Sequence, residues 1–137
     1  MAIGSDSHVT IDPFEELRWL EYGQRLTTQS RNVSVFDGGH TGYILFDLVA
    51  TGGARASGQQ TGRLESGALA DLVVLDDADP MFGGHDEDTL LDALIFSGYR
   101  VPIERVMVHG EWQVVNGRHV SDNDSREAYR RVLEALR

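Results

Sequence analysis

The sequence contains no cysteine among its 137 residues, which excludes disulfide bonds and thiolate metal sites. It also lacks any apolar run near the roughly 18 residues that a membrane-spanning helix needs. Its N-terminus has no basic region followed by an apolar region, the pattern of a secretory signal peptide. We therefore expect a soluble, cytoplasmic protein that does not act in a membrane.

Basic residues are scarce: 12 stand against 22 acidic residues, which gives a net charge of −10 and an isoelectric point near 4.7. Nucleic acids and anionic membranes attract a positive field, so we expect neither as a partner. The hydrophobic share of 41% and the charged share of 25% are typical of a globular domain. The length suffices for one domain with a core.

Recognisable catalytic motifs are also missing. No His-x-His pair, His-Glu-x-x-His motif or Gly-x-Ser-x-Gly elbow occurs in the sequence. The histidines are isolated along the chain, mostly in expected turns or strand ends: His8, His40, His85, His109 and His119. The stretch "TGGARASG" lacks the Gly-Lys-Ser/Thr ending of a phosphate loop, so we interpret it as the end of a helix.

The first helix is predicted from Pro13 to near Gln29. Asp12 can cap it, proline suits the first helical position, and Glu15 stands where a capping-box acid would. Apolar residues form two stripes, which indicates a helix covered on two sides. Where most of the covering elements are missing, we expect this helix to expose an apolar patch that promotes self-association around Phe14, Leu17, Trp19 and Leu20.

The middle of the chain is expected to mix helices and strands. A loop with the turn Asp37-Gly38-Gly39 precedes a helix over 43–50, which the glycine-rich residues 51–58 end. A strand over 72–75 and a helix over 86–96 follow.

The last part of the chain is expected to form a hairpin meander and a helix. Strands over 106–108, 112–115 and 118–120 have Asn116-Gly117 as a type I′ turn between the last two. In the closing helix we expect Asp124 to be the N-cap. Its apolar residues recur at i, i+3, i+4 and i+7: Tyr129, Val132, Leu133 and Leu136.

The opening "GSDSH" stretch, residues 4–8, places Asp6 just before the first helix. Barrel enzymes put catalytic groups at the carboxyl ends of strands, facing the helix that follows. A capped Ser-Asp-Ser loop without any catalytic role explains the same residues, so position alone leaves both interpretations open.

Three stretches resemble the amidohydrolase superfamily and together cover nearly the whole chain. "GSDSHVTIDPFEELRWLEYGQRL" is similar to its last barrel strand and the following helix, "GRLESGALADLVVLD" to the return into its small β domain, and "VMVHGEWQVVNGRH" to the closing hairpin of that domain. The first stretch more narrowly resembles superfamily deiminases that hydrolyse the formimino C–N bond of N-formimino-L-glutamate to N-formyl-L-glutamate and ammonia.

The resemblance implies a site and a cofactor. Superfamily members use a divalent metal, usually Zn²⁺, to activate a water, and the aspartate after the last barrel strand contacts the metal and carries the proton to the departing nitrogen. Asp6 matches this aspartate, as metal ligand and as catalytic residue. Ser7 and His8 are candidates for substrate binding. The histidine ligands of earlier barrel strands have no counterpart in the sequence.

The implied fold is α/β: a C-terminal fragment of a metal-dependent hydrolase TIM barrel, with its last strand and helices, plus part of the small β-sandwich domain and a C-terminal helix. A whole barrel needs about 200 residues or more. We expect barrel elements in 1–58, the β domain with an inserted helix near 86–97 in 59–120, and the last helix in 121–137.

The resemblance leaves alternatives open. The chain could instead be part of a guanine- or triazine-type deaminase, or a non-catalytic remnant or interaction module. As part of an enzyme it would bind a small-molecule substrate. It would form a homo-oligomer at full length, or self-associate as a fragment, which alone is expected to be inactive.

Overall fold

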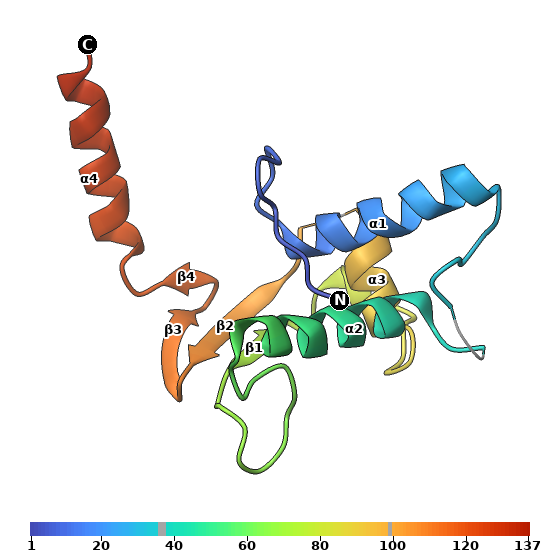
Figure 1. The fold of residues 1–137 in the computed structure, drawn as a ribbon. Helices are drawn as coiled ribbons and strands as arrows, with labels where there is room; N and C mark the ends of the chain where they lie inside the picture. The colour runs from blue at the N-terminus through green and yellow to red at the C-terminus, as the bar shows by residue number, and fades with distance from the viewer. Residues whose placement is uncertain (36–37, 99) are drawn as a thin grey trace. The chain divides into compact units, whose positions relative to one another are not determined.

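The computed structural model describes residues 1–35, 38–98 and 100–137 and divides the chain into two compact units (Figure 1). The first unit comprises Met1–Ala68 and Asp77–Val101, and the second comprises Leu69–Asp76 and Pro102–Arg137. The expected turn residue Asp37 lies outside the described residues.

The first unit is helical, with α1 (Pro13–Thr28), α2 (Thr41–Ser57), the short 3-10 helix η1 (Pro80–Phe82) and α3 (Leu90–Phe96). The expected cap of α1 is confirmed, because the Asp12 carboxylate accepts from the backbone N–H groups of Phe14 at 2.8 Å and Glu15 at 3.3 Å. The Glu15 carboxylate accepts from the Trp19 indole one turn further on.

The core of this unit joins three helices. Leu17 of α1, Leu45 of α2 and Ile95 of α3 are fully buried together, and α3 packs against both other helices (Figure 1). The prediction of an exposed apolar patch on α1 is therefore wrong for three of its four residues. Leu17 is 1% exposed, Phe14 and Leu20 pack against the core, and Trp19 alone remains exposed at 56%. The sequence pattern was right about an apolar face, but α3, far along the chain, covers it.

Helix α2 is longer than the expected 43–50, because it runs through the glycine-rich stretch and ends at Ser57. The expectation that this stretch ends the helix is confirmed at its last residue, because Gly58 is the C-cap with a left-handed φ of 69°. Glycine at two earlier positions of α2 allows close packing instead. A Cβ at Gly52 would overlap the backbone of Met1, and a Cβ at Gly42 would collide with the backbone of Leu91 and Asp92. Helix α3 is shorter than expected, because Asp86 and Thr89 bond each other in a separate turn before it begins.

The second unit is built on a four-stranded antiparallel sheet with the order β1 (Leu72–Leu75), β2 (Ile103–Val108), β3 (Glu111–Val115) and β4 (Arg118–His119). The meander and the Asn116-Gly117 turn are confirmed, with both turn residues at positive φ. The Asp71 carboxylate accepts from the His109 backbone N–H at 2.8 Å and ties the first hairpin turn to the start of β1.

Helix α4 (Asp122–Ala135) closes the chain. It begins two residues before the expected cap, so Asp124 lies inside its first turn. Ser121 precedes the helix and makes no side-chain capping bond. The position of Asp124 as N-cap was therefore wrong, whereas the amphipathic spacing of the helix is confirmed.

The mixed α/β class is confirmed, and the barrel detail stays a prediction. Residues 1–12 form no strand within the described chain, and a barrel strand requires neighbouring strands to hydrogen-bond with. The division into 1–58, 59–120 and 121–137 also stays a prediction. Helix α3, inside the middle span, packs with α1 and α2.

Candidate functional site

The three predicted site residues share one tight turn just before α1. The His8 backbone N–H donates to the Ser5 carbonyl at 2.6 Å, and Asp6 in the turn has a left-handed φ of 39°. Aspartate tolerates this conformation better than most residues. Asp6, Ser7 and His8 are all solvent-exposed. The turn therefore displays a carboxylate, a hydroxyl and an imidazole within a few residues of one another.

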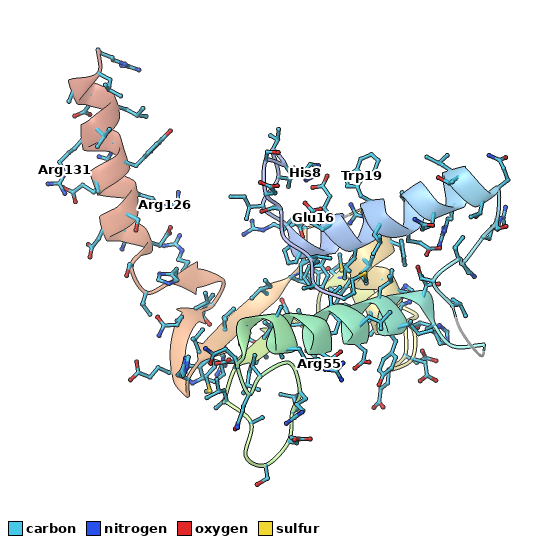
Figure 2. All side chains as sticks on the ribbon, in the orientation of Figure 1. His8, Glu16, Trp19, Arg55, Arg126 and Arg131 are labelled. Atoms are coloured by element: carbon cyan, nitrogen blue, oxygen red, sulfur yellow. The ribbon has the colours of Figure 1, made fainter. Side chains whose placement is uncertain are left out.

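The turn is attached to α1 through His8. Its Nδ1 atom lies 3.0 Å from Oε1 of Glu16, a contact that becomes an ion pair when the imidazole is protonated. Figure 2 shows the two side chains near one another above α1. Glu16 Oε1 is shielded from solvent and has no aligned hydrogen bond within the described residues, and the His8 imidazole lies beside it.

A small hollow of about 120 Å³ adjoins the turn, lined by residues on both sides of it: Ile3, Gly4, Ser5, Ile11, Asp12, Pro13 and Glu16. Asp6, Ser7 and His8 are not part of its lining. The structure thus brings the predicted residues together in sequence and in space, but it does not enclose them in a pocket.

Metal binding needs several ligands around one point, and Asp6 belongs to no such group within the described residues. Across residues 1–35, 38–98 and 100–137, no three His, Cys, Asp or Glu side chains gather closely enough to hold an ion. One exposed carboxylate does not fit a resident divalent cation. What Asp6 offers within this chain is a solvent-accessible carboxylate.

Glu21 is an ionised group that the sequence analysis missed. Its side chain is fully buried in α1, where the carboxylate accepts from Arg25 at 2.7 Å and from the backbone N–H groups of Val33 and Ser34, each at 3.0 Å. Burial opposes ionisation, but hydrogen bonds from Ser34, Arg25 and Val33 outweigh it and lower the pKa of Glu21. The Glu-to-Arg spacing of four residues was the available signal. The cluster fixes the loop after α1.

Asp92 of α3 makes a second structural cluster at the start of α2. Its carboxylate accepts from the Gly42 backbone N–H and lies 2.9 Å from Nδ1 of His40. An anionic side chain here satisfies an otherwise free N–H at a helix N-terminus and complements the helix dipole. The contact therefore explains His40 as part of a helix–helix joint.

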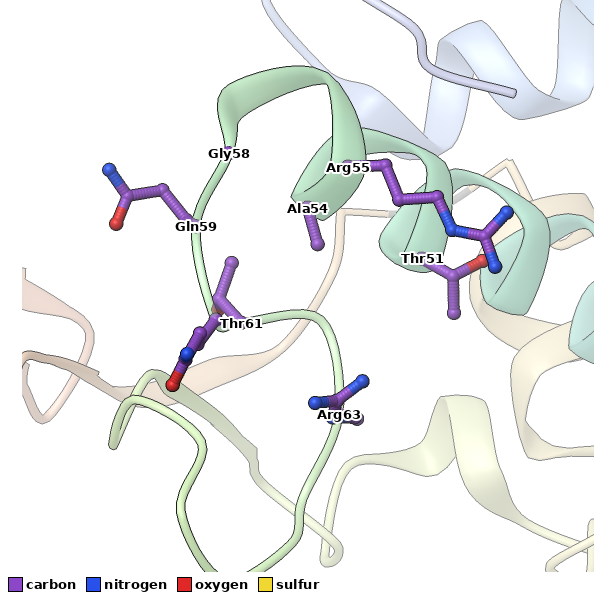
Figure 3. Close-up of a pocket in the computed structure, with 8 residues that line it drawn as sticks. Thr51, Ala54, Arg55, Gly58, Gln59, Thr61 and Arg63 are labelled. Atoms are coloured by element: carbon purple, nitrogen blue, oxygen red, sulfur yellow. The ribbon is translucent and has the colours of Figure 1, made fainter.

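Another pocket, of about 240 Å³, lies at the end of α2 and is drawn in Figure 3. Arg55 and Arg63 both line it, and Arg63 pairs with Glu65 at 2.6 Å. Arginine near a helix C-terminus complements the helix dipole. None of Asp6, Ser7 and His8 lines this pocket, so it is separate from the turn.

The pattern of the amidohydrolase family matches residues 1–112, and the chain belongs to this family. A more particular likeness follows from two relatives. The chain is 44% identical over 137 residues to formimidoylglutamate deiminase from Pseudomonas aeruginosa, covering 99% of this chain and 30% of that protein. It also matches the crystal structure of an amidohydrolase from Brucella melitensis with a TM-score of 0.83 and 40% identity, covering 98% of this chain and 30% of that one.

These likenesses confirm the resemblance of the sequence to the amidohydrolase superfamily. They also confirm its narrower resemblance to a formimidoylglutamate deiminase. The chain spans about a third of the length of either relative. No helix among the described residues is long and apolar enough to cross a membrane.

Proposed function

We propose that this chain is the C-terminal, Asp6-bearing part of a deiminase that hydrolyses the formimino C–N bond of N-formimino-L-glutamate. The observation that carries the proposal is the 44% identity over 137 residues to formimidoylglutamate deiminase. The products are N-formyl-L-glutamate and ammonia. Water adds to the formimino carbon, and the bond to the terminal nitrogen breaks.

In this reaction the Asp6 carboxylate transfers protons. Its carboxylate accepts a proton from the attacking water and returns it to the departing nitrogen, which leaves as ammonia, so the carboxylate is regenerated in each turnover. Exposure on a tight turn leaves this carboxylate open to a reactant. Ser7 and His8, from the same turn, contact the substrate.

His8 and Glu16 support this arrangement. Their 3.0 Å contact ties the turn to α1, a helix anchored in the core by Leu17. A carboxylate held by a rigid element keeps its geometry toward a reactant better than one on a free chain end.

In the deiminase a divalent metal such as Zn²⁺ would supply Lewis-acid chemistry, and Asp6 would be its one ligand from this chain. Because the described residues do not form a metal site, the chain alone is expected to bind Zn²⁺ no better than isolated carboxylates do and to be inactive.

The test compares the chain alone with a fusion that restores the preceding part of the Pseudomonas aeruginosa relative. With added Zn²⁺, the fusion should release ammonia from N-formimino-L-glutamate and the chain alone should not. Asp6→Asn should lower turnover of the fusion by about 10²- to 10⁴-fold, while Asp12→Asn, which retains a helix cap, should leave it nearly unchanged. Near-normal turnover with Asp6→Asn would overturn the role of this residue.

A further inference from the structure

Glu16 in the first turn of α1 has a carboxylate oxygen whose hydrogen bonding is incomplete. Its Oε1 atom is shielded from solvent and has no aligned partner within the described residues. A shielded acceptor without a donor costs free energy, because it has given up its hydrogen bonds to water. Most such atoms in native proteins are paired. A donor that reaches this oxygen would therefore stabilise the structure around it.

His8 supplies that donor. Its Nδ1 atom lies 3.0 Å from Glu16 Oε1, which is a hydrogen-bond distance, so only the angle of the contact falls short. The last side-chain torsion of histidine is broad, so a small rotation of the ring aligns the Nδ1 proton with the oxygen. The backbone of His8 is held by its hydrogen bond to the Ser5 carbonyl.

We propose that Glu16 is a positioning residue, which holds the imidazole of His8 with its proton on Nδ1 and so leaves Nε2 to accept a hydrogen bond from an N–H group of the substrate. In a neutral imidazole one ring nitrogen donates and the other accepts, so donation from Nδ1 to Glu16 leaves the free lone pair on Nε2. The formimino group carries N–H donors on both of its nitrogens, which such an acceptor fits. The identity of the substrate rests on the proposed function.

The place of His8 in the turn suits this contact. It lies two residues after Asp6 and is exposed, and its Nε2 atom has no hydrogen bond within the described part of the chain. Glu16 belongs to a helix that Leu17 anchors in the core. A ring held through one nitrogen by a rigid helix presents the other nitrogen in a defined direction, which lowers the entropy cost of binding.

Glu15 gives a matched control for the charge of Glu16. Both carboxylates lie in the first turn of α1, where negative charge complements the helix dipole. The Glu15 carboxylate accepts from the Trp19 indole, whereas that of Glu16 lies beside His8. Replacing either residue by alanine removes the same charge from the helix start, and only the replacement of Glu16 should change the imidazole.

Two other histidines serve as internal references for the position of the proton. Nδ1 of His40 lies 2.9 Å from the Asp92 carboxylate, an acceptor, so its proton is expected on Nδ1. Nδ1 of His119 accepts from the Ser121 backbone N–H at 3.1 Å, so its proton is expected on Nε2. Unchanged signals of these two rings show that a variant is folded.

Nitrogen-15 NMR of the whole chain with labelled histidine measures which ring nitrogen of His8 carries the proton. At about pH 9, where imidazoles are neutral, the proton should be on Nδ1 in the wild type and on Nε2 in Glu16→Ala. Glu15→Ala should leave it on Nδ1. The His8 signal is identified by its loss in His8→Gln. A proton on Nε2 in the wild type, which needs no variant to observe, or on Nδ1 in folded Glu16→Ala, would overturn the positioning role.

The substrate contact is measured in the fusion with the Pseudomonas aeruginosa relative. Glu16→Ala should raise KM for N-formimino-L-glutamate about 3- to 10-fold, the value of one hydrogen bond. It should leave kcat nearly unchanged, because the contact is made in the bound substrate and in the transition state alike. Glu15→Ala should change neither constant. An unchanged KM in Glu16→Ala, or equal changes in the two variants, would overturn the substrate contact.

The two experiments separate this inference from the proposed function. A wild-type fusion that releases no ammonia would overturn the proposed function and the substrate contact with it. The position of the His8 proton in the chain alone would still decide whether Glu16 positions the imidazole.

Discussion

Helices α1 and α4 both carry apolar side chains at helical spacing, yet among the described residues those of α1 pack into a core and none of α4 is buried. Leu17 of α1 is 1% exposed, whereas Leu133 of α4 is 43% exposed. Helix α1 meets α3, which the chain supplies more than sixty residues later. An amphipathic pattern therefore predicts that a helix will be covered, but it does not predict which element covers it.

The strongest contrast is expected in the core. Leu17→Ala should lower the free energy of unfolding by about 3 kcal/mol through lost burial and a cavity. Leu133→Ala should change it by less than about 0.5 kcal/mol, since the side chain is half-exposed. Urea unfolding followed by Trp19 fluorescence in a W112F background, at a concentration where the chain is monomeric, measures both. Equal losses would remove the distinction between the two helices.

Buried charge gives the next contrast. Glu21→Ala leaves the backbone N–H groups of Val33 and Ser34 without their acceptor, which should cost about 2 kcal/mol. Glu134→Ala in α4 removes an exposed carboxylate and should cost almost nothing. The same unfolding experiment compares them. A small effect at Glu21 would show that water replaces the carboxylate there.

The pH dependence should follow the same residue. The pKa of Glu21 is lowered from its ordinary value of about 4.5, so the unfolded chain binds a proton more readily than the folded one. The stabilisation is complete above pH 4.5 and is lost as the pH falls toward the lowered value. Glu21→Gln should flatten this acid loss, measured as unfolding free energy from pH 6 to pH 3. An unchanged pH profile would place the acid sensitivity elsewhere.

The smallest contrast concerns the helix starts. Asp12→Ala removes a side-chain cap of α1 and should cost about 1 kcal/mol. Ser121→Ala should have no measurable effect, because Ser121 makes no such bond at α4. Thermal unfolding by circular dichroism resolves the difference, with Asp12→Asn as the control that keeps a cap.

Features set by neighbours in sequence were predictable. The Asp12 cap and the Asn116-Gly117 turn depend on a few adjacent residues, and the structure has both. The length of α2 was missed because the reason for its glycines is distant: Gly52 meets Met1 and Gly42 meets Leu91. Glu21 was missed for a similar reason, since its backbone partners lie in the loop after the helix.

The candidate site divides in the same way. The tight turn around Asp6 follows from short polar residues and is present. The role proposed for Asp6 rests on the family resemblance, because a single exposed carboxylate carries no chemical signature of its own. His8 was named for its position, and its contact with Glu16 could not be read from the sequence, since several carboxylates were equally near.

The hydrogen bond from the Asp76 backbone N–H to the Pro102 carbonyl, at 2.9 Å, has a consequence for the order of folding. β2, β3 and β4 follow one another through tight turns, so this ribbon can form early and locally. β1 reaches β2 only after the chain closes a loop over residues 77–101, with the entropy cost that a long loop carries. Amide hydrogens of β1 should therefore gain protection from exchange later than those between β2 and β3.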